Sequence, residues 1–284
     1  MSIRTILAPV RGDGKGEGVL DHALAIAKRF DAHIQVVHAR AKPDELIPFG
    51  TLLTESMRKD IIASAQSSAA EAEQHLRKLF DDYCANNGLS VSDTPVAPGS
   101  GVSASWCEET GKQADIVGLR GRLADLIVVP RPDGESQLGF NTLEAALMET
   151  GRLVLMTPPA AAETVGDHVA IAWNGSAEAA RAVAMAMPAL GQAKFVTILV
   201  STERTDAADR LLNHLQWHQI DAKVGIFGHK SDEIGRSLLE AANHASADLL
   251  LMGGYGHSRR REMVMGGATQ YIIENAELPV MMAH

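Results

Sequence analysis

Short, continuous apolar runs alternate with helical patterns along most of the chain. Residues 6–10 and 34–38 are two such runs, and an alanine-rich helical pattern, 19–30, separates them. Uninterrupted apolar runs are typical of strands that are buried on both faces of a parallel sheet. The alternating order therefore predicts an open, doubly wound α/β sheet with right-handed crossovers.

The same order of elements occurs twice, so the chain reads as a tandem duplication. The matching segments are 6–12 with 169–175, 124–129 with 247–252, and 153–156 with 279–282. Residues 158–166 carry two prolines and a glycine and have no periodicity, which indicates a linker. We therefore predict two five-stranded parallel α/β domains at 1–157 and 166–284.

The pattern also predicts individual elements. In the second domain we expect strands at 168–173, 194–200, 222–227, 248–252 and 279–283, and helices at 176–188, 204–217, 231–245 and 262–275. The first domain is expanded by a long helix at 51–86, whose apolar stripe we expect to pack on the sheet or on the other domain. Each half ends in an apolar strand, and exposed strand edges are a liability. We expect the halves to associate through these edges as a pseudo-dimer, and a homodimer is also possible.

Composition narrows the functional classes. Hydrophobic residues make up 46% of the 284 residues, charged residues make up 21%, and the net charge is −9. This is ordinary globular composition, and an acidic protein disfavours nucleic-acid binding. No apolar stretch is long enough to cross a membrane, and the amino terminus shows no signal sequence. The two cysteines fit a reducing compartment, so we expect a cytoplasmic protein.

A glycine-rich segment, 252–269, contains the most informative chemistry. It leaves a predicted buried strand and enters a predicted helix, which is the edge where open α/β sheets bind ligands. Glycines let backbone N–H groups approach an anion, the helix amino terminus adds partial positive charge, and arginines 259–261 add formal charge. These are the parts of a phosphate cradle. The alternative is a sharp strand-to-helix turn followed by solvated arginines.

With these features the sequence resembles the universal stress protein family, as two fused copies over nearly the whole chain. The resemblance rests on the tandem units, the run 248–253, the glycine spacing of 253, 256 and 266, and the final run 279–282. It implies an adenine-nucleotide alpha hydrolase-like fold, ATP held at the glycine loop, adenosine held near an Asp after the first strand, and pairing through the last strands. The candidate nucleotide-binding residues are Asn174, Gly253, Gly256, His257, Arg259, Arg260, Gly266, Gly267 and Thr269.

The sequence departs from the family pattern at several positions. Gly267 replaces the expected Ser or Thr, although Thr269 follows closely, and restoring a serine at 267 is expected to strengthen binding. The expected Asp is Asn174 in the second domain and Arg11 in the first. The first-domain loop, 130–142, contains prolines and acids. We therefore expect the first domain to have lost the site and the second to keep an altered one.

Other chemistries have weaker support. His214 and His218 are spaced to share a metal but lack a third ligand, so we assign no metal site. Cys107, beside Trp106, is expected in a helix as a core residue.

No catalytic residue is assigned. We expect a stress-response binding or signalling protein with at most weak ATP hydrolysis, and the sequence leaves a role for Mg²⁺ open. Two alternatives are a nucleotide-free interaction protein and an enzyme with its site between the domains.

Overall fold

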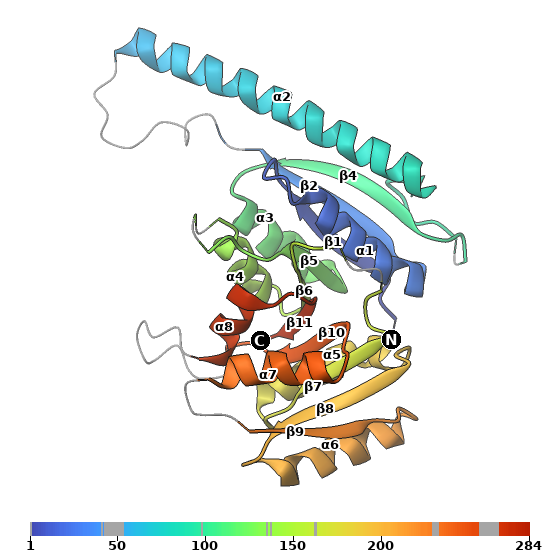
Figure 1. Ribbon diagram of the computed structural model, residues 1–284. Helices are drawn as coiled ribbons and strands as arrows, with labels where there is room; N and C mark the ends of the chain where they lie inside the picture. Colours follow the sequence, from blue (N-terminus) through green and yellow to red (C-terminus); the bar gives the residue numbers. More distant parts are fainter. Residues whose placement is uncertain are drawn as a thin grey trace.

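The computed structural model describes residues 2–40, 42, 54–97, 99–134, 136, 138–161, 164–228, 233–255 and 267–284. These residues form one 11-stranded sheet in the order β3-β4-β2-β1-β5-β6-β11-β10-β7-β8-β9 (Figure 1). Every pairing is parallel except that between β6 and β11. The predicted fold class is confirmed.

The first half of the sheet contains six strands, one more than predicted, because a two-residue strand is added at its outer edge. The strands are β1 (Thr5–Val10), β2 (His33–Arg40), β3 (Ser90–Val91), β4 (Ser103–Thr110), β5 (Leu126–Pro130) and β6 (Leu153–Thr157). The helices are α1 (Gly16–Phe30), α2 (Glu55–Asn87), α3 (Gln113–Arg120), the 3-10 helix η2 (Gly121–Leu123) and α4 (Phe140–Glu149).

The second half follows the predicted element order, with boundaries within a few residues except at the last helix. The sequence predicts that helix from 262, but Gly267 is not helical, and residues 262–266 lie outside the described residues. Its strands are β7 (His168–Ala172), β8 (Phe195–Ser201), β9 (Lys223–Phe227), β10 (Leu249–Gly253) and β11 (Val280–Ala283). Its helices are α5 (Ala177–Leu190), α6 (Thr205–Trp217), α7 (Ile234–His244) and α8 (Ala268–Asn275). The division into two domains at the linker stays a prediction, so the two parts are called halves below.

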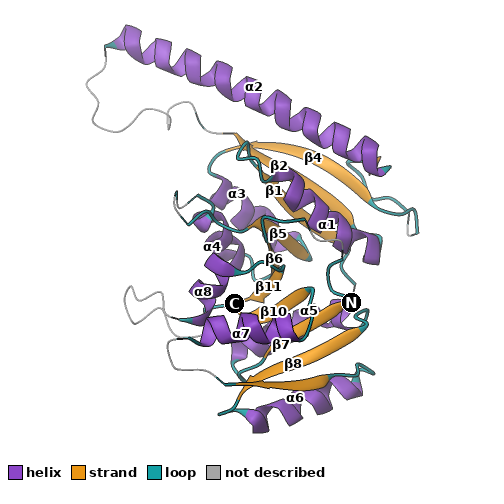
Figure 2. Ribbon diagram, viewed as in Figure 1, coloured by secondary structure: helices purple, strands orange, loops and turns teal. Residues whose placement is uncertain are grey.

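Helices cover both faces of the sheet, as continuous apolar strands require. Residues of α1, α2, α5 and α6 belong to one buried cluster, and residues of α3, α4, α7 and α8 belong to the other (Figure 2). Along β1, Ile6 and Ala8 point into the first cluster and Leu7 points into the second. This alternation explains why the strand is apolar at every position.

The halves join through their last strands, as the edge argument predicts. In this antiparallel pairing, Val280 lies opposite Met156 and Met282 lies opposite Val154. All four side chains are buried. The pairing removes two apolar edges from water and makes one continuous sheet.

An aspartate in the repeated segment has the same structural role in both halves. Asp125, just before β5, accepts hydrogen bonds from the backbone N–H groups of Arg4 and Thr5. Asp248, just before β10, accepts from the backbone N–H groups of Gly166, Asp167 and His168. Each carboxylate therefore ties the start of one strand to the start of its neighbour.

Two expectations for the first half need correction. Cys107 lies in β4 and not in a helix, and it is only half buried. β4 pairs with β2 along its whole length, and this tertiary pairing overrides the local pattern. The Cys107 sulfur accepts a hydrogen bond from Arg120 at 3.0 Å.

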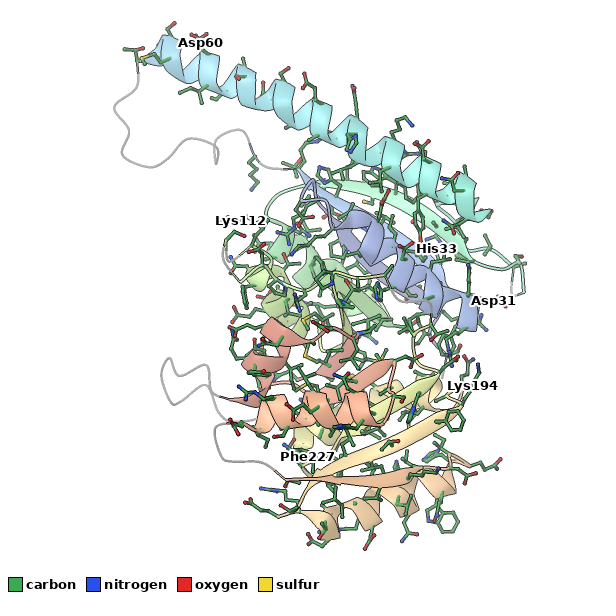
Figure 3. All side chains as sticks on the ribbon, viewed as in Figure 1. Asp31, His33, Asp60, Lys112, Lys194 and Phe227 are labelled. Atoms are coloured by element: carbon green, nitrogen blue, oxygen red, sulfur yellow. The ribbon has the colours of Figure 1, made fainter. Side chains whose placement is uncertain are left out.

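The apolar stripe of the long helix packs on the sheet only near the carboxyl end of α2. There Leu76, Phe80 and Cys84 are buried, and Phe80 contacts Trp106 of β4. The amino-terminal turns extend beyond β2 and β4, with Asp60 far from the sheet (Figure 3). The part of this predicted helix at 51–53 lies outside the described residues.

Arg29 of α1 connects the two halves away from the β6–β11 pairing. It donates hydrogen bonds to the carboxylate of Asp167 (2.7 Å) and to the carbonyls of Gly166 (3.1 Å) and Gln192 (2.8 Å). Hydrogen bonds from Lys194 and from Arg29 lower the pKa of Asp167. The guanidinium group therefore links α1 to the start of the second half by hydrogen bonds.

Replacing Arg29 by alanine should lower the free energy of unfolding by about 1–3 kcal/mol, because three acceptors lose their donor. Lys194→Ala is the matched control, because Lys194 also pairs with Asp167 but its side chain is 69% exposed. That exposed pair should change stability by less than about 1 kcal/mol. Urea unfolding measures both, and equal effects of the two variants would contradict this role of Arg29.

Candidate functional site

The candidate site lies at the carboxyl ends of β7 and β10 in the second half. These strands are neighbours in the sheet, and the segments after them lead into α5 and toward α8. Of the predicted site residues, the structure places Asn174, Gly253, Gly267 and Thr269. The predicted residues Gly256, His257, Arg259, Arg260 and Gly266 lie outside the described residues.

Gly253 ends β10 in direct contact with the first turn of α5. A Cβ atom at this position would lie 2.5 Å from the backbone nitrogen of Ala179 and 2.7 Å from the carbonyl carbon of Glu178. Backbone atoms cannot move away as a flexible side chain can, so only glycine fits here. This first motif glycine therefore has a packing role in addition to any role in ligand binding.

Asn174 is exposed at the turn after β7. Its side-chain oxygen accepts a hydrogen bond from the backbone N–H of Ser176 (3.0 Å), and its carbonyl accepts one from Arg204 (2.9 Å). Ser176 in turn caps α5 by accepting from the N–H of Ala179. The Asn174 side chain thus shapes its own turn, and Arg204 is a cation at this edge that sequence reasoning missed.

Glu178 is a carboxylate beside the glycine loop that sequence reasoning also missed. It lies in the first turn of α5, next to Gly253. A hydrogen bond from its own backbone N–H, together with the Ser176 hydroxyl and the nearby His284, lowers the pKa of Glu178. The amino terminus of α5 is therefore already capped and negatively charged, so it is a poor place for a phosphate.

The amino terminus of α8 has the opposite character. Its cap is Gly267, which has no side chain that could accept from the first N–H groups, and its first turn contains no acidic residue. Thr269 is half buried in the same turn. The N–H groups at a helix start that has no side-chain cap, together with the helix dipole, favour an anion.

The backbone of Gly267 explains why the sequence departs from the family pattern there. Its φ of 84° and ψ of −132° lie in a region that residues with a side chain rarely adopt. A serine at 267 would be strained, so the expectation that this change strengthens binding is not supported. Thr269 is the hydroxyl that the described part of α8 offers in its first turn.

The loop after β10 continues into residues that contact both halves. The N–H of Gly254 donates to the carbonyl of Ala283 (2.8 Å), and the His284 ring lies 3.1 Å from the Gly254 carbonyl. Tyr255 has a positive φ of 54°. Burial, with a smaller contribution from Glu144 of α4, raises the pKa of the Tyr255 hydroxyl.

In the first half, the side chains of Arg11 and Lys15 extend across the position that corresponds to the candidate site. Arg11, after β1, donates a hydrogen bond to the hydroxyl of Thr142 in the first turn of α4 (3.1 Å) and lies 3.4 Å from the Asp13 carboxylate. Lys15 donates to the carbonyl of Arg131 (2.9 Å). Burial lowers the pKa of Arg11, although Asp13 opposes this shift.

The first-half loop is also closed by its own hydrogen bonds. The N–H of Asp133 donates to the carbonyl of Leu138, and the Asp133 carboxylate accepts from the N–H of Ser136. The Arg131 side chain extends out of the loop and donates a hydrogen bond to the carbonyl of Ala276, at the carboxyl end of α8. These contacts tie the loop down as a structural element.

The other candidate chemistries gain no support. The rings of His214, in α6, and His218, just after it, are 4.9 Å apart. Among the described residues, no group of three or more His, Cys, Asp or Glu side chains could hold a metal ion. None of the described helices is long and apolar enough to cross a membrane.

Gly253→Ala should lower the free energy of unfolding by about 1–3 kcal/mol, because the added methyl overlaps the backbone of α5. Gly254→Ala is the matched control, since among the described residues a Cβ atom there would meet only the Ala283 carbonyl at 3.8 Å. Thermal and urea unfolding of both variants measure the difference. Equal stability of the two variants would show that α5 does not approach β10 this closely.

Comparisons with known proteins bear on the family and the fold. Residues 218–284, which include the loop and α8, match the model of the universal stress protein family. No curated protein matches the chain by sequence.

Solved structures with the same fold cover both halves. A universal stress protein from Archaeoglobus fulgidus DSM 4304 has a TM-score of 0.72 and 15% identity, over 99% of this chain and 96% of its own. A putative universal stress protein from Pseudomonas aeruginosa UCBPP-PA14 has a TM-score of 0.55 and 17% identity, over 99% and 93%. At these identities the likeness concerns the fold.

Proposed function

We propose that the protein is a cytoplasmic stress-response module of the universal stress protein family, whose model matches residues 218–284, and that it binds an adenine nucleotide, such as ATP, in its second half. The observation that carries the proposal is the amino terminus of α8, whose cap Gly267 has no side chain. It has no acid in its first turn, and it follows the loop that contains arginines 259–261. The described residues fit a phosphate there through backbone N–H groups and Thr269.

The proposed ligand contacts follow from this arrangement. Phosphate oxygens would accept from the N–H groups at the start of α8 and from the arginines of the loop, while Asn174 and Arg204 lie at the edge where the nucleoside would extend. The Glu178 carboxylate would repel phosphate from α5, which directs the phosphates toward α8. We propose binding with little turnover, because phosphoryl transfer also needs a positioned nucleophile and charge neutralisation.

We expect Gly256→Val to weaken ATP binding more than Arg259→Ala, because a β-branched side chain blocks both the turn and the approach of the N–H groups. Arg259→Ala should weaken ATP more than adenosine, by about 10-fold, since the lost contact is to phosphate. Calorimetry with ATP and with adenosine measures these affinities. Thr142→Val, in the first turn of α4, is the matched control and should leave both affinities unchanged.

If Gly256→Val binds ATP as the parent does, or if Arg259→Ala affects ATP and adenosine equally, the loop is a turn and not a phosphate site. The same holds if the parent binds neither compound. Those results favour the second candidate function, a nucleotide-free interaction protein of the same fold. The observation that favours it is Gly267, which lacks the hydroxyl that the family pattern leads us to expect.

We also expect at most one nucleotide per chain. Arg11 reaches the first turn of α4, whereas Asn174, the corresponding residue of the second half, bonds to its own turn at Ser176. Calorimetric titration of the parent chain should give a stoichiometry near one. Two equivalent sites per chain would contradict the assignment of Arg11 as the group that fills the first-half position.

A further inference from the structure

One edge of the sheet is long and apolar. β9 is the last strand at one end of the described sheet, whereas the other end is β3, which has only two residues. β9 spans five residues and lies beyond β8, with Phe227 at its end (Figure 3). Short or charged edge strands resist pairing with other chains, and long apolar ones do not.

Two of the three exposed side chains of β9 are apolar, and the third is that of Lys223. Val224 is 39% exposed and Ile226 is 59% exposed. They alternate along the strand, so they share one face of the sheet. Gly225 lies between them, and a Cβ atom there would lie 2.9 Å from the Leu199 side chain. Lys223 is the only charged residue in the strand.

The free edge of β9 also carries hydrogen-bonding groups. The carbonyl of Phe227 accepts from the N–H of Thr202, which follows β8, so Phe227 turns its backbone toward β8. Successive residues of a strand direct their N–H and C=O groups to opposite sides. The backbone groups of Val224 and Ile226 are therefore directed away from β8, at the free edge.

We propose that β9 pairs antiparallel with β9 of a second copy of this chain, about a two-fold axis at Gly225. The five residues are self-complementary in this register. Val224 of each copy lies opposite Ile226 of the other, and each such pair exchanges two backbone hydrogen bonds. Lys223 lies opposite Phe227, so the two lysines stand at opposite ends of the ladder and do not repel each other.

Other registers of this antiparallel pairing make fewer favourable contacts between the two strands. A shift of one residue turns the apolar side chains to opposite faces, and a larger shift removes an apolar pair and places Lys223 beside Gly225. Because the same residues supply both sides, the contact is isologous and closes as a dimer. A second copy therefore supplies a strand that matches this edge in length and keeps the two lysines apart.

The test compares two variants of the full chain by sedimentation equilibrium. Ile226→Pro removes the outward N–H and leaves the bonds to β8 intact, since proline is tolerated at a strand edge. Ile226→Thr keeps that N–H and the β-branched shape. We expect the parent to dimerise in the range of about 10–100 µM, as suits a small interface, the proline variant to bind at least tenfold more weakly, and the threonine variant to lie between them.

Hydrogen exchange gives an independent readout that does not depend on folding of a variant. In the parent, the amides of Val224 and Ile226 should exchange more slowly as the protein concentration rises, with or without ATP. A parent that stays monomeric throughout this range overturns the proposal and leaves the edge to a strand of another protein. A dimer that Ile226→Pro does not weaken, and whose β9 amides show no concentration dependence, also overturns it.

Discussion

The antiparallel pairing of β6 with β11 is the constraint on which the rest of the structure depends. The strands within each half are parallel to one another, and the direction reverses between β6 and β11. The carboxyl ends of the first-half strands therefore point in the opposite direction from those of the second-half strands. Arg131, which follows a first-half strand, accordingly meets the carboxyl end of α8, just before β11. The two candidate ligand edges therefore do not face each other, which argues against an active site shared between the halves.

The difference between the halves depends on the residue after the first strand of each. Arg11 is long and cationic, so it reaches the first turn of α4 and bonds to Thr142. Asn174 is short, and it bonds to its own turn at Ser176. The same fold thus presents one helix amino terminus, that of α4, which a side chain from the turn after the first strand contacts, and one, that of α8, whose cap Gly267 has no side chain.

The fold could be read from the sequence because continuous apolar runs and repeated Ala-Asp-Leu segments report strands and their starts directly. Asp125 and Asp248 have the same hydrogen-bonding role, so the repeat reflects a shared physical need. Glu178, Arg204 and the strain at Gly267 could not be predicted, because they depend on how α5, α6 and α8 meet the strand ends. Cys107 was assigned to a helix because pairing between β2 and β4 is non-local and leaves a weak local pattern.

The same duplication accounts for the unequal edges of the sheet. Fusion of the halves buries β6 and β11 against each other and leaves one outer edge in each half. In the first half, the insertion that contains α2 packs Phe80 and Cys84 over β4, and the sheet there ends in the two-residue β3. The second half has no such insertion. Its edge strand β9 has five residues, and Val224 and Ile226 are exposed on it. The expansion of one half therefore protects one edge and leaves the other as the surface where further strand pairing can take place.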